Sequence, residues 1–253
     1  EQGTSLASLQ PTAAAGIRIF RGRTPAVFHL ISIDSLDRPE LAPYHTMRRP
    51  AGHVAQRIFV TEGEKVVRRL LESDYEVGSA LMPEPWAREL APLLAARPED
   101  IPVFVAPKPV LEQLTGFSMF QGVLAVGRMP HPRPLAEILE RAPRPWLIVA
   151  LEALANAENL GVIIRNCAAF GVTALVAGET CSSPFMRRSV RNSMGTIFKL
   201  PVVEPPSLLA TLAELRHLGV HCVAADGNAT GATLARTDLN RDCCLVFGSE
   251  GHG

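Results

Sequence analysis

Four nearly continuous apolar runs in the second half of the chain restrict its fold most strongly. Each run has the length of one strand, and stretches with helical periodicity separate them. Strands of a parallel sheet are buried on both faces, so they lack the polar and apolar alternation of half-exposed strands. The runs therefore predict an α/β domain with a parallel sheet. They are Trp146–Leu151, Val172–Ala177, Val220–Ala225 and Cys243–Gly248.

The helix between the second pair of runs has the clearest boundaries. Ser207 can cap its start, Leu208, Leu212 and Leu215 form one apolar stripe, and Gly219 follows its end. A helix over 207–218 is therefore expected between two parallel strands.

The first half predicts a smaller α/β unit. Its strands are expected at 57–60, 77–82, 101–105 and 122–127, with helices at 64–72 and 85–96, and a separate strand is expected before it at 26–32. Five prolines between residues 129 and 145 resist packing into a core and indicate a linker around a short helix at 135–141. The expected organisation is an N-terminal extension (1–34), a small α/β domain (35–128), the linker (129–145) and a parallel-sheet domain (146–253).

Composition limits the class of protein without naming its partner. Of the 253 residues 47% are hydrophobic, which is enough for a substantial core, and no apolar run reaches the roughly 18–20 residues of a membrane span. No secretory signal is visible, so a cytoplasmic protein without a membrane partner is expected. Its 25 basic and 25 acidic residues cancel, which neither supports nor excludes nucleic-acid binding, because a local basic patch suffices.

The cysteines and the common cofactor motifs exclude several kinds of site. Five cysteines form no CxxC pair and the seven histidines do not cluster with them, so no metal site is expected. The sequence lacks GxGxxG, the GxxxxGK[ST] phosphate loop and the GxSxG nucleophile elbow. These absences disfavour an unrelated hydrolase or nucleotide-binding enzyme.

Residues 151–171 combine a helix start with an isolated arginine. Asn159 is expected to cap this helix, and Leu160, Ile163, Ile164 and Cys167 form its apolar stripe. Gly161 leaves space for another group to approach the first turn. Arg165 falls off the stripe, and an ordinary capped helix with one solvated arginine would explain the same pattern.

The final segment joins a buried strand to a glycine-rich loop. Gly248, Gly251 and Gly253 would expose backbone amides and carbonyls to a ligand, and Glu250 could order the loop. A flexible glycine tail is the alternative.

Together these segments resemble the SpoU (TrmH-type) family of SPOUT-class RNA 2′-O-ribose methyltransferases. The pattern Asn159-x-Gly161-x3-Arg165 with Phe170-Gly171 is similar to the first family signature, and residues 247–253 (FGSEGHG) are similar to the start of the second. Residues 185–201 resemble the segment between the signatures. Phe59–Gly63 resembles part of the RNA-binding domain that often precedes them.

The resemblance implies a fold and a cofactor site. The fold is a parallel α/β sheet with a C-terminal trefoil knot, preceded by a small RNA-binding domain and assembled as a homodimer. The third signature, a Ser-Leu-Asn stretch, does not follow Gly253, so the knot-completing segment is absent from the given chain. The cofactor, S-adenosylmethionine, is expected near five residues: Ala225, Gly227, Gly248, Glu250 and Gly251.

The same resemblance implies roles in methyl transfer to rRNA or tRNA. Arg165 is the expected catalytic residue, and Asn159 would orient Arg165 or the target ribose. Arg187, Arg188 and Arg191 form a basic group that could bind RNA phosphates, although a solvated helix face fits equally well. The alternative function is that of a non-catalytic RNA-binding homologue that has lost its cofactor.

Overall fold

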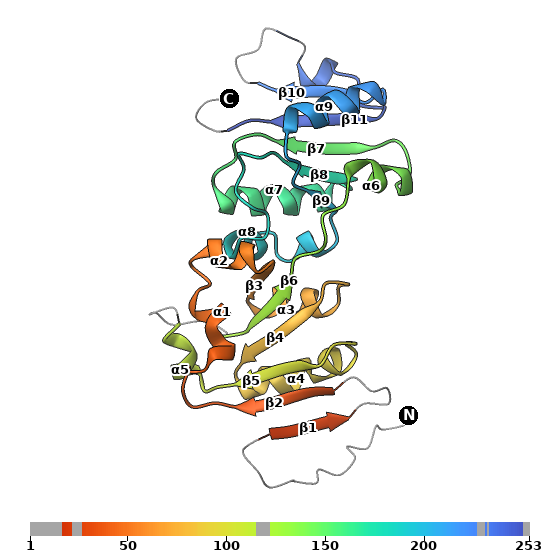
Figure 1. Ribbon diagram of the computed structural model, residues 1–253. Helices are drawn as coiled ribbons and strands as arrows, with labels where there is room; N and C mark the ends of the chain where they lie inside the picture. Colours follow the sequence, from red (N-terminus) through yellow and green to blue (C-terminus); the bar gives the residue numbers. More distant parts are fainter. Residues whose placement is uncertain (1–16, 22–26, 115–121, 227–230, 232, 250–253) are drawn as a thin grey trace, which may run out of the picture.

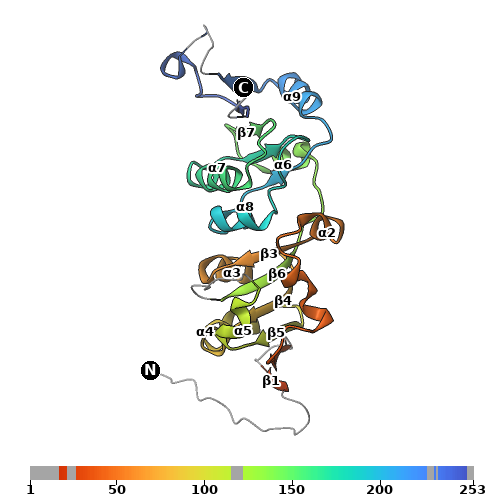
Figure 2. The same cartoon turned by 90° about the vertical axis from the view of Figure 1, so that its left-hand side faces the viewer.

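A computed structural model describes residues 17–21, 27–114, 122–226, 231 and 233–249. These residues form two sheets that stand one above the other, with β1 (Ile17–Arg21) at one end of the molecule and β10 (His221–Ala225) at the other (Figure 1). The view from the side shows the same two-tier arrangement, with α8 (Arg187–Asn192) lying between the tiers (Figure 2).

The N-terminal sheet is mixed. Its strand order is β1-β2-β5-β4-β6-β3, in which β2, β5 and β4 are parallel neighbours and the remaining pairs are antiparallel. The strands are β1 (Ile17–Arg21), β2 (Val27–Ser32), β3 (Ile58–Glu62), β4 (Val77–Met82), β5 (Ile101–Val105) and β6 (Leu124–Arg128).

Helices cover both faces of this sheet. Val67 and Leu70 of α3 and Leu90 of α4 pack on one face, whereas Leu41 and Tyr44 pack on the other. The helices of this half are η1 (Pro39–Leu41), α1 (Ala42–His45), α2 (Pro50–Ala55), α3 (Glu64–Leu71), α4 (Glu84–Ala95) and α5 (Lys108–Glu112).

The second sheet is entirely parallel, as the apolar runs predicted. Its order is β10-β11-β7-β8-β9, formed by β7 (Leu147–Leu151), β8 (Ala174–Ala177), β9 (Val202–Val203), β10 (His221–Ala225) and β11 (Cys243–Phe247). Within β7, Val149 and Leu151 face α7, whereas Ile148 and Ala150 face α6 and α9. Both faces are buried, so the alternation of polar and apolar residues is absent. The helices of this half are α6 (Leu135–Arg141), α7 (Ala157–Ala169), α8 (Arg187–Asn192), η2 (Thr196–Phe198), α9 (Leu208–His217) and η3 (Leu234–Arg236).

The segment before residue 35 differs from the expected extension. β2 lies inside the N-terminal sheet, antiparallel to β1 and parallel to β5, with Phe28 2% exposed. The partner strand β5 lies about 70 residues further along the chain, so no local pattern could indicate this pairing.

The proline-rich segment combines exposed turns with a packed helix. All five prolines are exposed. Leu135, Ile138 and Leu139 of α6 are nevertheless buried against the second sheet. Helix α6 (Leu135–Arg141) thus covers part of one face of the second sheet. The domain limits within 129–145 stay a prediction.

An apolar core joins the two tiers. Phe59 of the N-terminal sheet lies with its ring centroid 5.7 Å from that of Phe198 and 5.5 Å from that of Phe185. Tyr75 packs 5.3 Å from Phe198. Burial of several aromatic rings in one cluster couples the position of the N-terminal sheet to that of α8 and η2.

Candidate active site

The candidate active site lies at the carboxyl edge of the parallel sheet, where loops from β7, β8 and β11 meet. The loop after β7 is held from both sides: the Glu152 amide donates to the Phe247 carbonyl at 2.9 Å, and the Ala153 amide donates to the Thr180 hydroxyl at 3.1 Å. The Ser182 amide donates to the Leu154 carbonyl at 2.9 Å. Open α/β sheets bind ligands at this edge, so these loops form a preorganised rim.

Helix α7 begins at this rim, and its N-cap residue is not the one that the sequence predicted. Asn156, not Asn159, is the N-cap: its side-chain oxygen accepts from the amides of Glu158 (2.8 Å) and Asn159 (3.2 Å). Asn159 therefore lies inside the first turn, because the helix starts three residues earlier than predicted. Both residues are asparagines, and the apolar stripe begins only at Leu160, so periodicity alone did not distinguish them.

The close approach predicted at Gly161 comes from a helix. A Cβ at Gly161 would lie 2.5 Å from the Ser189 carbonyl oxygen and 2.7 Å from the Asn192 Cβ, so α8 packs against this glycine. The Ser189 hydroxyl also donates to the Ala157 carbonyl at 2.8 Å. Gly161 thus fixes α8 against the first turns of α7.

Arg165 lies on the exposed side of α7, as its position off the apolar stripe indicated. Six residues separate it from Asn159, which amounts to about 9 Å along a helix axis and a different face. Direct orientation of Arg165 by Asn159 is therefore disfavoured within one helix. Arg165 is also about 12 Å along the axis from the start of α7, well back from the rim.

Two of the five expected cofactor residues lie together at the rim. Ala225 ends β10 and is paired with Phe247 in register, and Gly248 follows Phe247 directly. Gly227, Glu250 and Gly251 lie outside the described residues. Ala225 and Gly248 carry little or no side chain, so backbone groups of two neighbouring strand ends are accessible to a ligand at this edge.

The three arginines of α8 are engaged in ion pairs. Arg187 and Arg191 both pair with Glu62 at the end of β3, with Arg191 at 3.0 Å, and Arg188 lies 3.6 Å from Glu158. The Arg187 side chain is only 16% exposed, whereas Arg188 and Arg191 are 68% and 56% exposed. Arg187 therefore stabilises the contact between the two tiers, and the other two remain accessible to solvent. Sequence reasoning missed Glu62, which lies 125 residues from Arg187 and has no local signal.

The rim offers no ready thiolate nucleophile among its described residues. Cys181 donates from its thiol to the Leu151 carbonyl, and burial raises its pKa. Burial also raises the pKa of Cys167 on α7 to about 11. Both thiols stay protonated at neutral pH, so they serve packing rather than covalent chemistry. The described part of the chain contains no cluster of three metal-ligating side chains and no helix long and apolar enough to cross a membrane.

Comparisons with known proteins agree on one family. A profile of the SpoU rRNA Methylase family matches residues 146–253. An uncharacterized tRNA/rRNA methyltransferase of Mycobacterium tuberculosis is 31% identical over 225 residues, covering 86% of this chain and 76% of the relative.

Solved structures share the fold. An AdoMet-bound rRNA methyltransferase from Sinorhizobium meliloti superposes with a TM-score of 0.75 at 22% identity, covering 88% of this chain and 83% of that one. A structure described as an RNA 2′-O ribose methyltransferase gives a TM-score of 0.67 at 23% identity, covering 86% and 81%.

Proposed function

The chain belongs to the SpoU rRNA methylase family, and from this we propose that it transfers a methyl group from S-adenosylmethionine to a ribose 2′-hydroxyl of rRNA or tRNA. The observation that carries the proposal is Arg165: an exposed guanidinium on a helix whose start is capped by Asn156 and clamped by α8. The 2′-O ribose methyltransferase among the structural neighbours supports the choice of the hydroxyl over a base.

The described part of the rim fits the cofactor. S-adenosylmethionine, when bound, supplies a methyl group on a positively charged sulfur that is already activated for transfer. Ala225 and Gly248 present backbone groups at adjacent strand ends, suited to hydrogen bonds with an adenine. We assign Gly227, Glu250 and Gly251 to the same pocket on the family resemblance alone.

Arg165 is assigned to the ribose side of the reaction. A ribose hydroxyl is a weak acid, so negative charge develops on its oxygen as the proton leaves. A guanidinium stays protonated throughout the usable pH range and is therefore a poor base. Arg165 would instead hold the neighbouring phosphate and stabilise the charge on the 2′-oxygen, while the phosphate or water accepts the proton. Asn159 is assigned to the target ribose, because helix geometry disfavours its contact with Arg165.

The distance from Arg165 to the rim supports a homodimer. Arg165 lies about 12 Å along the axis from the start of α7, so it is set back from the rim of its own chain. Exposed apolar side chains lie nearby: Val162, one turn before Arg165, is 48% exposed, and Phe170, directly after the end of α7, is 78% exposed. We propose that this face packs on a second copy, so that Arg165 serves the cofactor pocket of the partner subunit.

Two further features complete the proposal. The family resemblance supports a trefoil knot formed by chain that follows β11. The N-terminal sheet would select the RNA, together with the exposed Arg188 and Arg191 of α8.

An Arg165→Ala variant of the full-length protein tests the assignment. We expect it to bind tritiated S-adenosylmethionine as the wild type does and to lose methyl transfer by at least about a hundredfold. Arg141→Ala, an exposed arginine on α6, is the matched control and should transfer methyl groups at the wild-type rate. Wild-type transfer by Arg165→Ala would contradict the catalytic role. Absence of cofactor binding by the wild type would favour the non-catalytic homologue.

A further inference from the structure

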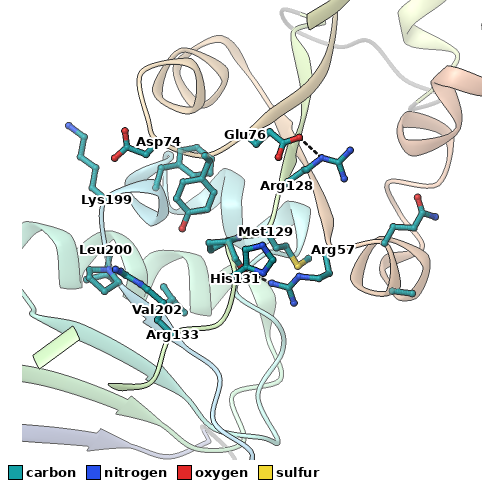
Figure 3. A pocket seen from close by; sticks show the side chains of 16 residues that line it. Arg57, Asp74, Glu76, Arg128, Met129, His131, Arg133, Lys199, Leu200 and Val202 are labelled. Atoms are coloured by element: carbon teal, nitrogen blue, oxygen red, sulfur yellow. Dashed lines mark hydrogen bonds and ion pairs between the residues drawn. The ribbon is translucent and has the colours of Figure 1, made fainter. Parts of the chain in front are cut away.

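A large cavity opens between the two tiers, away from the candidate active site. Its volume is about 880 Å³, and four separate segments line it: the end of α2 with the two residues before β3, the loop before β4, the end of β6 with the residues that follow, and the residues from the end of η2 to the start of β9 (Figure 3). Val202, which lines it, begins β9. Because β9 is parallel to β8, the cavity lies at the amino edge of the second sheet, opposite the rim.

The charges that line this cavity favour an anionic ligand. Arg57, Arg128, Arg133 and Lys199 line it together with two carboxylates, Asp74 and Glu76, so positive charge is in excess by two. Glu76 is already paired with Arg128 at 2.6 Å. In the described part of the chain Arg133 and Lys199 enter no ion pair, and both are exposed, so their charges remain available to a ligand.

The hollow continues beyond the cavity. A second cavity of about 590 Å³ lies on the face of the N-terminal sheet that bears α1, and it shares Gln56 and Arg128 with the first. Apolar side chains, among them Ile58 and Phe104, form much of its lining. The two cavities adjoin at Gln56 and Arg128, and together they are called the trough. Basic side chains line it at the junction of the tiers, and mainly apolar ones line it along the sheet, where Glu40 adds one carboxylate.

The positions of the charges in the trough and its apolar lining indicate which class of ligand it binds. A small anion is held best by donors that converge on one point, whereas these basic side chains are exposed and come from three separate segments around the first cavity. A chain with regularly spaced phosphates fits such an arrangement, because each phosphate can meet one cation. Apolar lining next to the cations suits bases and riboses, which carry no charge.

We propose that this trough binds the ribose-phosphate backbone of the substrate RNA at a distance from the nucleotide that is methylated. The inference rests on the proposed function, since it takes RNA as the substrate. The trough and the rim lie at opposite edges of the parallel sheet. The RNA therefore contacts both tiers, and Arg133 and Lys199 contribute to affinity without taking part in methyl transfer.

Salt dependence of RNA binding tests the trough directly. The change is Arg133→Ala combined with Lys199→Ala in the full-length protein, with unmodified ribosomal and transfer RNA transcripts as probes. Each lost phosphate contact lowers the slope of log K against log salt by about 0.7–0.9, so two contacts lower it by about 1.4–1.8. We expect this decrease, with a several-fold higher KM for RNA, an unchanged kcat at saturating RNA and unchanged S-adenosylmethionine binding.

Arg88→Ala combined with Lys108→Ala is the matched control. It removes the same two side-chain types from exposed positions that do not line the trough, and it should keep the wild-type slope. A wild-type slope and KM in the trough variant would overturn the inference, as would an equal decrease in both variants. If the wild type instead methylates neither RNA, the proposed function itself fails.

Discussion

Replacement of Gly161 by alanine tests how the active-site helix is held. The new Cβ would lie 2.5 Å from the Ser189 carbonyl oxygen, whereas ordinary van der Waals contacts begin near 3.4 Å. The two helices would have to separate by about 0.9 Å at this point. Ser189 is tied to Ala157 by a 2.8 Å hydrogen bond, so the separation also strains that contact.

The magnitude follows from two opposing effects. Overpacking of a tight contact costs about 1–3 kcal/mol. Alanine in place of glycine inside a helix recovers about 0.8–1 kcal/mol through helix propensity. The expected result for Gly161→Ala is therefore a loss of unfolding free energy between about zero and 2 kcal/mol.

Gly52→Ala supplies the control that separates these effects. Gly52 is also helical, in α2, and a Cβ there meets nothing within 4 Å, so the variant should gain about 0.4–1 kcal/mol. Urea unfolding of both variants should give free energies of unfolding that differ by about 0.4–3 kcal/mol, with Gly52→Ala the more stable. Equal stabilisation by the two substitutions would refute the close packing of α7 and α8.

Two further predictions concern charged residues of the N-terminal half. Glu62→Gln should lower the free energy of unfolding by about 1.5–3 kcal/mol, because it leaves the nearly buried Arg187 without its carboxylate. The control Glu137→Gln removes the carboxylate of an exposed ion pair and should lower it by about 0.5 kcal/mol or less. Equal losses for the two variants in urea unfolding would contradict the role of Glu62. Burial acts to raise the pKa of Glu99, but hydrogen bonds from Arg97 and from backbone amides outweigh it and hold that pKa below 4.5. The stability that Glu99 contributes should thus be present above pH 4.5 and lost as the pH falls through the lower pKa of the folded state. Glu99→Gln should therefore reduce the fall in thermal midpoint below pH 4.5. An unchanged fall in this variant would exclude the contribution of Glu99.

The parallel sheet was predictable because its central strands β7 and β8 are buried on both faces and leave continuous apolar runs, whereas the two-residue strand β9 leaves no run and was not predicted. The start of α7 was harder to predict, because Asn156 and Asn159 are equally good N-cap residues and only the structure distinguishes them. β1 and β2 were not assigned to the N-terminal sheet because their pairing depends on β5, far along the chain.

The candidate site was predictable only as single residues. Arg165 and Gly161 are close in sequence and carry a recognisable pattern, so the sequence predicted the exposed position of Arg165 and the close contact at Gly161, while the role of Arg165 stays a prediction. The pairing of Glu62 with Arg187 and the trough between the tiers bring together segments separated by more than 100 residues. No local pattern encodes such contacts, because they depend on how the two sheets stack.

The position of the transferred methyl group tests the central claim most directly. The full-length protein is incubated with unmodified ribosomal or transfer RNA transcripts and S-adenosylmethionine tritiated on the methyl group, and the product is hydrolysed in alkali. Alkaline cleavage of RNA needs a free 2′-hydroxyl, so a 2′-O-methyl nucleotide stays joined to its neighbour. We predict tritium in alkali-resistant dinucleotides, whereas tritium in mononucleotides would place the methyl group on a base and contradict the account.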